Sequence, residues 1–163
     1  MPREIERKFL LQSDAWRSQA RESRTMSQGY LASGGRLSVR VRVAGADAWL
    51  NIKAGGLLMS RQEYEYPIPL DEARELLALA EGPLIEKTRH FVEHAGKTFE
   101  IDEFRGENEG LVVAELELDS EDEPFSRPPW LGTEVTQLRR YYNVCLVTHP
   151  YRAWNDAERN PSP

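Results

Sequence analysis

Charged side chains recur at every second residue in several short segments of this chain. Residues i and i+2 of a β-strand point to the same face, so Glu4, Glu6 and Lys8 would share one face of a strand. The same spacing recurs in Arg40/Arg42, Arg61/Glu63/Glu65, Lys87/Arg89, Glu100/Asp102 and Glu115/Glu117. The residues between them are mostly apolar, which predicts strands with one charged face and one apolar face.

The signs of these charges are sorted within most of the predicted strands. A solvated sheet face would also be polar, but like charges about 7 Å apart repel each other, and a solvated face gains nothing from that arrangement. Serine and threonine, which are common on solvated strand faces, are nearly absent from these positions. A sheet that closes into a barrel with its charged face inward explains both features.

A barrel interior with separate acidic and basic groups would suit one kind of ligand. Carboxylate clusters bind hard divalent cations. Arginine and lysine clusters bind phosphate oxygens, and arginine can do so through two parallel hydrogen bonds. The sequence therefore predicts a site for a polyphosphate chelated to a metal ion.

Short segments bounded by turn residues predict the strands that would carry these groups. Their expected ranges are 4–11, 28–31, 36–43, 49–53, 61–69, 85–94, 97–104 and 111–118, with a turn at 54–56. Helices are expected from a cap at Ser13 or Asp14 to about residue 24, over 71–81 and over 137–147. Many short strands with few helices favour an α+β protein built on an antiparallel sheet or barrel.

Composition limits the class of protein further. The length of 163 residues suits a single domain. The formal net charge of −6 argues against a nucleic-acid partner held by bulk positive charge. A single cysteine, Cys145, excludes an internal disulfide and is typical of a reducing compartment. The first residues show no apolar signal segment and no apolar run could span a bilayer, so a cytoplasmic protein without a membrane partner is expected.

One ordered set of motifs resembles a known family. Residues 4–8, Glu-Ile-Glu-Arg-Lys, are similar to the ExExK signature of the CYTH superfamily, the triphosphate tunnel metalloenzymes. The later motifs follow in the order of that family: residues 28–31, 38–42, 51–53, 61–65, 86–89, 99–102, 115–117, 130, 134–136 and 141–143. ExExK alone is a weak motif, whereas the ordered set is specific.

The resemblance implies an eight-stranded antiparallel β-barrel that forms a tunnel and binds a triphosphate with Mg²⁺ or Mn²⁺. It assigns residues 1–149 to this domain, and residues 150–163 are expected to form a polar, flexible tail in which Trp154 is able to dock. The best metal ligands by this resemblance are Glu4, Glu6, Glu115 and Glu117, followed by Glu63 and Asp102. Glu65 and Glu100 are either further ligands or partners that hold neighbouring arginines.

The basic residues are expected to line the tunnel as phosphate clamps. They are Lys8, Arg40, Arg42, Lys53, Arg61, Lys87 and Arg89, with Arg139 of the last predicted helix as a further candidate. Lys8 and Tyr30 resemble a pair that some family members use for proton transfer, which a lowered pKa of Lys8 would assist. Tyr30 could instead pack in the barrel and bind a phosphate. Lys87 is expected to act catalytically, and either Lys87 or Arg89 would lie nearer the leaving phosphate.

The expected activity is metal-dependent hydrolysis of inorganic triphosphate to pyrophosphate and phosphate. Thiamine triphosphatase, nucleoside triphosphatase and class IV adenylyl cyclase are alternatives within the family, and a polyphosphate-binding module without turnover is an alternative outside enzymes. The expected partner is a small triphosphate compound, and the protein would be a monomer or a homodimer.

Overall fold

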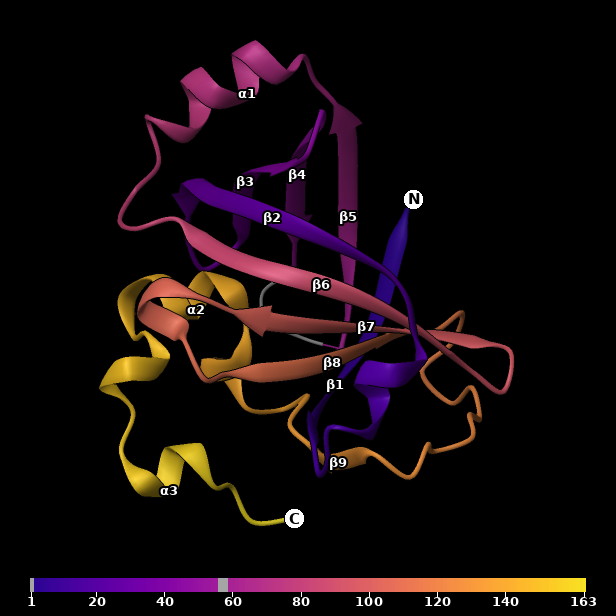
Figure 1. The fold of residues 1–163 in the computed structure, drawn as a ribbon. Coiled ribbons are helices and arrows are strands. Elements are labelled where there is room, and N and C mark those ends of the chain that lie inside the picture. Colours follow the sequence, from indigo (N-terminus) through magenta and orange to yellow (C-terminus); the bar gives the residue numbers. More distant parts are fainter. Residues whose placement is uncertain (1, 56–58) are drawn as a thin grey trace.

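The protein folds into a closed antiparallel β-barrel (Figure 1). The computed structural model describes residues 2–55 and 59–163. Neighbouring strands follow the order β5-β4-β3-β2-β6-β7-β8-β1, and pairing of β5 with β1 closes the ring. A ninth strand, β9, pairs with the outer part of β1. The expected eight-stranded antiparallel barrel is therefore confirmed, with one added strand.

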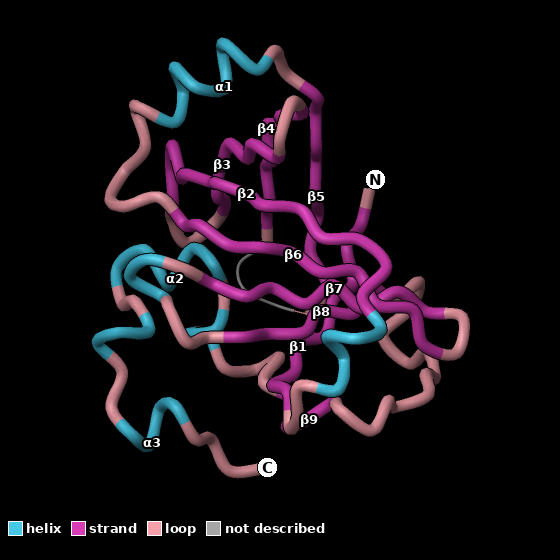
Figure 2. Tube along the Cα trace, viewed as in Figure 1, coloured by secondary structure: helices cyan, strands magenta, loops and turns pink. Residues whose placement is uncertain are grey.

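The strands match the expected segments closely, apart from β2 and β9. They are β1 (Arg3–Leu11), β2 (Ala20–Ser33), β3 (Leu37–Ala44), β4 (Asp47–Ala54), β5 (Ser60–Pro67), β6 (Ile85–His94), β7 (Lys97–Phe104), β8 (Val112–Glu117) and β9 (Leu131–Glu134). The helices are α1 (Leu70–Leu77), α2 (Asn143–Thr148) and α3 (Asp156–Arg159), and Figure 2 shows them outside the ring of strands. The turn expected at 54–56 ends on a residue that lies outside the described ranges.

All three expected helices differ in extent from the structure, and the one expected over 71–81 already ends at Leu77. The other two differ more. The helix expected to run to residue 24 is only a 3₁₀ turn at Ala15–Gln19, because β2 already begins at Ala20 and pairs with β6 from there. The last expected helix is broken at Tyr142, whose extended backbone separates a 3₁₀ turn at Arg139–Tyr141 from α2. Strand pairing with β6 prevents the first of these helices, and the extended backbone of Tyr142 interrupts the second. In both places the spacing of apolar residues alone predicted too long a helix.

The apolar outer face of the barrel is covered in separate patches. The loop and 3₁₀ segments bury Trp16 and Trp130 against β1, β7 and β8 through residues such as Phe9 and Phe99. On another part of the barrel, α1 covers β3 and β4 around Val41 and Ala73. These patches bury the apolar side chains of the outer face. The alternate side chains of the same strands point inward and are mostly polar.

The C-terminal segment covers one end of the barrel. Here the inward side of the strands turns apolar, since Phe104 lies opposite Lys87 and Val113 lies opposite Asp102 in the register. These side chains form a cluster with Leu146 of α2 and with Trp154, which is 4% exposed. Trp154 therefore docks, and the segment after residue 150 contains a 3₁₀ turn at Tyr151–Ala153 as well as α3.

Candidate functional site

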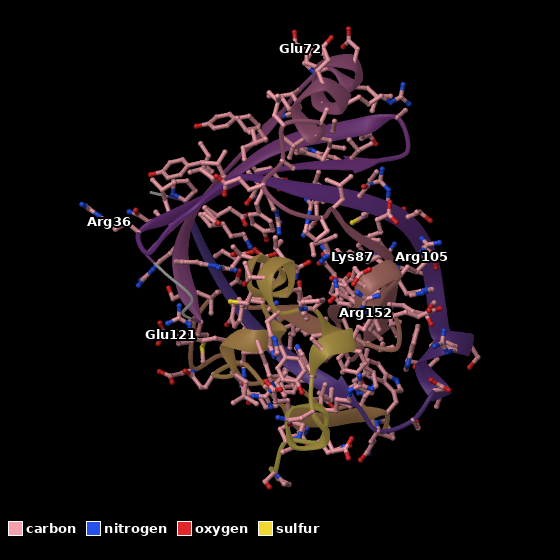
Figure 3. The ribbon with its side chains drawn as sticks, turned by 90° about the vertical axis from the view of Figure 1, so that its left-hand side faces the viewer. Arg36, Glu72, Lys87, Arg105, Glu121 and Arg152 are labelled. Atoms are coloured by element: carbon pink, nitrogen blue, oxygen red, sulfur yellow. The ribbon has the colours of Figure 1, made fainter. Side chains whose placement is uncertain are left out.

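A charged cavity of about 190 Å³ lies inside the barrel. Its walls come from β1 to β8, and the start of α2 contributes to one end. The lining residues are Glu4, Glu6, Lys8, Tyr30, Ser38, Arg40, Arg42, Lys53, Arg61, Glu63, Glu65, Lys87, Arg89, Glu100, Glu115, Glu117, Tyr142, Asn143 and Val144. The charged face of the predicted strands thus faces inward. Figure 3 shows Lys87 near the middle of the molecule, whereas Arg36 and Glu72 project outward.

The register of neighbouring strands determines which charged side chains lie next to each other in the cavity wall. Lys8 lies directly opposite Glu115, and Glu4 lies opposite Arg61, so these pairs can neutralise each other. Glu6, however, lies directly opposite Glu117. Like charges at opposed positions of an antiparallel pair are destabilising. This position in the wall therefore favours a bound cation.

Lys8 is held between two carboxylates. Its Nζ lies 2.7 Å from an oxygen of Glu115 and 2.9 Å from an oxygen of Glu6, and it stands 4.7 Å from the centre of the Tyr142 ring. Burial by itself lowers the pKa of Lys8, but the charges of Glu115 and Glu6 outweigh it and raise the pKa above its usual value. The expected lowering of this pKa is therefore wrong, and Lys8 stays protonated.

Asp102 lies behind the cavity lining and accepts hydrogen bonds from two basic side chains, Lys87 and Arg89. Its oxygens accept hydrogen bonds from Lys87 Nζ at 2.7 Å and from Arg89 Nε and Nη2 at 2.8 and 2.9 Å. Arg89 also reaches Glu100 at 2.7 Å and Glu115 at 3.2 Å. Burial and the positive charge of Arg89 outweigh Asp102 and lower the pKa of Lys87 to about 8. Lys87 is thus the lysine in this cavity whose environment favours loss of a proton.

A third ion-pair cluster joins β1, β4 and β5. Lys53 lies 2.8 Å from Glu4 and 3.3 Å from Glu63, and Arg61 lies 3.3 Å from Glu4. Arg42 contacts Glu65 at 3.1 Å in the neighbouring part of the wall. Lysine and arginine side chains contact each of these carboxylates. The carboxylates therefore position the basic residues and also supply negative charge to the cavity.

Two charged residues in the cavity have no partner of opposite charge within 4.0 Å among residues 2–55 and 59–163. They are Arg40 and Glu117, and the Nε atom of Arg40 is also buried without a hydrogen-bond partner. Desolvation and the repulsion of Glu4, Glu100 and other carboxylates raise the pKa of Glu117 to about 7. Burial lowers the pKa of Arg40, but Tyr30 and Glu4 outweigh it and raise that pKa. Within the described ranges the cavity therefore carries one cation and one carboxyl group that no ion pair compensates.

The basic side of the cavity is crowded with positive charge, although Arg42 is paired with Glu65. Burial and the positive charges of Arg40 and Arg89 lower the pKa of Arg42 to about 10. An arginine remains charged at that value. Positive charges crowded to this extent are stabilised when a polyanion binds between them.

The structure brings most of the predicted site residues together, with two exceptions. Asp102 does not line the cavity, because it is fully buried beneath Lys87 and Arg89. Arg139 lies in a neighbouring pocket of about 230 Å³, which shares Ser38, Lys53, Arg61 and Val144 with the tunnel cavity. Arg139 is set apart because the last helix is broken ahead of α2.

Sequence reasoning missed four residues that line the cavity: Ser38, Tyr142, Asn143 and Val144. Tyr142 and Asn143 belong to a motif that carries the family resemblance, but helical spacing predicted only a covering helix there. Their position at the end of the tunnel depends on the break before α2, which the local sequence does not signal.

The carboxylates fit a hard divalent cation. Glu6 and Glu117 face each other, and oxygen ligands of this kind suit Mg²⁺ and Mn²⁺. Within the described part of the chain, no three histidine, cysteine or acidic side chains are already gathered closely enough to hold a metal ion. Lysine and arginine occupy several of the carboxylates instead, as the ion pairs above show. A cation would complete this acidic side by drawing carboxylates toward it.

The fold and cavity together define a β-barrel that encloses a charged tunnel. Comparison with known proteins agrees: a model of the CYTH domain matches residues 2–149. The chain belongs to the CYTH domain family. No helix in the described ranges is long and apolar enough to cross a membrane.

Two known proteins are similar to this chain over most of its length. An inorganic triphosphatase of Acetivibrio thermocellus is 46% identical over 157 residues, which cover 96% of this chain and all of that protein. An inorganic triphosphatase of Nitrosomonas europaea is 37% identical over 148 residues, which cover 88% of this chain and 96% of that protein. A crystal structure of an inorganic triphosphatase superposes with a TM-score of 0.64 at 34% identity, covering 88% of this chain and 93% of that one.

Proposed function

We propose that this protein hydrolyses inorganic triphosphate to pyrophosphate and phosphate inside the barrel, with the help of a divalent cation. The observation that carries the proposal is the pair of uncompensated charges in the tunnel, Arg40 on one side and Glu117 on the other. A metal–triphosphate complex supplies both missing charges at once. The inorganic triphosphatases at 46% and 37% identity support the same activity.

The metal site would be built on the acidic side of the tunnel. Glu6 and Glu117 are the proposed ligands, because they face each other in the register. Glu4, Glu63 and Glu115 are further candidates, and each would have to exchange a lysine or arginine partner for the metal. A bound Mg²⁺ or Mn²⁺ would neutralise phosphate charge and polarise the attacking water.

The basic residues bind and orient the phosphate chain. Within the described ranges the buried Nε atoms of Arg40 and Arg42 have no hydrogen-bond partner, and we infer that these guanidinium groups bind phosphate oxygens. Phosphoryl transfer builds charge on the equatorial and leaving oxygens, so fixed cations beside those oxygens lower its barrier. Lys53, Arg61 and Arg89 are held in place by carboxylates and extend this basic surface.

Proton transfer is assigned to Lys87 rather than Lys8. The pKa of Lys87 is lowered to about 8, so this ammonium group can give a proton to a leaving phosphate oxygen near neutral pH. Lys8 is held protonated by Glu6 and Glu115, and we infer that it maintains the geometry of the acidic side. Tyr30 stands beside Arg40 in the strand register, where its hydroxyl can bind a phosphate.

Phosphate release from triphosphate, ATP and thiamine triphosphate, measured side by side with Mg²⁺, Mn²⁺ and a chelator, tests the proposal. Turnover of triphosphate that is lost with the chelator is the expected result. A preference for ATP or thiamine triphosphate would assign the neighbouring 230 Å³ pocket to an organic group and overturn the inorganic substrate. Tight binding without turnover of any compound would show a binding module instead.

A further inference from the structure

Asn143 connects the C-terminal helix to the basic wall of the tunnel. It is the first residue of α2 and is 7% exposed. Its Oδ1 accepts hydrogen bonds from Lys87 Nζ at 3.0 Å and from Gln28 Nε2 at 2.9 Å. Asn143 also lines the cavity, whereas Gln28 lies behind it and is fully buried.

The chemistry of its neighbours determines how the Asn143 amide is oriented. An ammonium group can only donate hydrogen bonds, so the oxygen of Asn143 must face Lys87. The amide nitrogen then points the other way. Among the described residues this nitrogen has no hydrogen-bond partner, while Oδ1 has two. Two N–H groups are therefore left to donate at the edge of the cavity.

Lys87 has one donor left on the same side. An ammonium carries three N–H groups. One is bonded to Asp102 at 2.7 Å and one to Asn143 at 3.0 Å, and Lys87 lines the cavity. Asn143 and Lys87 thus form a small donor group, in which each fixes the orientation of the other.

We propose that Asn143 is a substrate-binding residue: its Nδ2 donates to a phosphate oxygen, and its Oδ1 positions the Lys87 ammonium against the same phosphate. This inference rests on the proposed function, since it takes the ligand of the tunnel to be a triphosphate. It also means that the phosphate site is completed by a residue from outside the barrel. The amide adds donors without further charge in a place where Arg40 already repels both Arg42 and Lys87.

The helix that carries Asn143 is anchored well enough to fix this contact. The Tyr142 hydroxyl donates to the Thr136 carbonyl at 2.9 Å, and Leu146 is fully buried in the cluster at the end of the barrel. Residues before and after Asn143 are therefore held independently of the ligand. An amide held in this way loses little conformational entropy when it binds a phosphate.

Two variants of Asn143 separate binding from a purely structural role. Asn143→Asp keeps the shape and the acceptor that faces Lys87 and Gln28, but it removes both N–H donors. Asn143→Ala removes donor and acceptor without adding charge. The control is Gln19→Ala, which removes the hydrogen-bond acceptor of the buried Trp130 and lies neither in the cavity lining nor in the C-terminal segment.

The affinity for imidotriphosphate with Mg²⁺, measured by calorimetry, is the readout, together with the melting temperature of each variant. A hydrogen bond to a charged acceptor predicts a loss of affinity of about 10- to 100-fold in Asn143→Ala. Asn143→Asp should lose at least as much while its melting temperature stays at or above that of the parent protein. Gln19→Ala should melt earlier but bind normally.

Unchanged affinity in Asn143→Ala would overturn the proposal, even if Asn143→Asp binds poorly, because charge alone would then explain the aspartate. If Asn143→Ala does not fold, the aspartate variant decides at 0.5 M salt, where long-range repulsion is screened. If the Asn143→Asp variant and the parent protein bind equally well at 0.5 M salt, the proposed contact between Asn143 and the phosphate is wrong. A wild-type protein that binds but does not hydrolyse triphosphate would defeat the proposed hydrolysis and leave this test intact.

Discussion

Individual charged residues in the tunnel have two kinds of role. Lys8, Arg89 and Asp102 are satisfied by partners within the protein, and they hold the walls in shape. Arg40 and Glu117 have no ion-pair partner in the described ranges, and each lies near like charges. Leaving such groups uncompensated costs folding free energy. The cost is offset when a ligand supplies the missing charge.

Glu117→Gln is expected to abolish metal-dependent activity and to raise the melting temperature of the free protein. The glutamine loses a proposed metal ligand, which should lower kcat by about 100-fold or more. It also removes repulsion from Glu4, Glu63 and Glu100, the charges that raise the pKa of Glu117. Enzyme assays and thermal unfolding measure the two effects. Glu93→Gln, an exposed residue of β6 that does not line the cavity, is the matched control. Near-normal rates in the Glu117 variant would remove Glu117 as a ligand.

Arg40→Ala is expected to raise KM for triphosphate by about 10- to 100-fold, since it removes a charged donor to phosphate. Stability of the free protein should fall little, because no ion pair is broken. Steady-state kinetics and denaturant unfolding test both parts. Arg36→Ala, which changes an exposed arginine between β2 and β3 that projects outward in Figure 3, should leave KM unchanged. Constants equal to the parent values would place Arg40 outside the substrate site.

Among the elements, the strands supply the charges and the C-terminal segment completes the enclosure. Tyr142 and Asn143 reach the cavity only because α2 packs on the apolar end of the barrel. Trp154 supports that packing, since its ring contacts Tyr141 at 4.9 Å and its Nε1 donates to the His149 carbonyl at 3.0 Å. The segment after residue 150 therefore bears on the site, although it contributes no lining residue to the tunnel cavity.

Trp154→Ala is expected to destabilise the protein by about 3–5 kcal/mol, the usual cost of removing a buried tryptophan. The loosened segment should also raise KM, because Asn143 would be held less firmly. Denaturant unfolding and steady-state kinetics give the two values. Arg152→Ala changes an exposed neighbour in the same segment and serves as the control. A Trp154 variant as stable as the parent would show that the segment is dispensable for the barrel.

At the scale of the whole molecule, the closed barrel gathers acidic and basic side chains, many of them ion-paired, around one cavity. A net charge of −6 coexists with a basic wall, because the acidic residues are distributed over the outer surface as well as the tunnel. The sheet is closed because β5 pairs with β1, so the paired residues of these two strands do not form an exposed sheet edge. A rigid ring of this kind can hold unfavourable charges in place until a ligand binds.

Triphosphate and Mg²⁺ together are expected to stabilise the protein more than the sum of the two alone. Each compensates a different uncompensated charge, and each also attracts the other. A ligand at 100 times its dissociation constant stabilises the folded state by about 2.7 kcal/mol. Thermal unfolding with each component and with both measures the difference. Purely additive shifts would show that the metal and the phosphate bind independently.

The sequence by itself determined the barrel and the inner position of its charges. Alternation of charge and apolar residues, as in Glu115, Leu116 and Glu117, leaves one arrangement in which the apolar face is covered and like charges gain a ligand. These signals are local, because residues i and i+2 share a face in any strand. The ordered motifs then indicated the family, which the match over residues 2–149 shows.

The tertiary structure alone decided how individual charges are used. Asp102 and Glu100 share a strand face, yet Asp102 lies buried beneath two cations and Glu100 lines the cavity. The length of β2 and the break before α2 likewise depend on distant partners rather than on local spacing. Whether a charge is paired or left free depends on strand register and on the distances across the barrel, and these are properties of the closed ring rather than of any one segment.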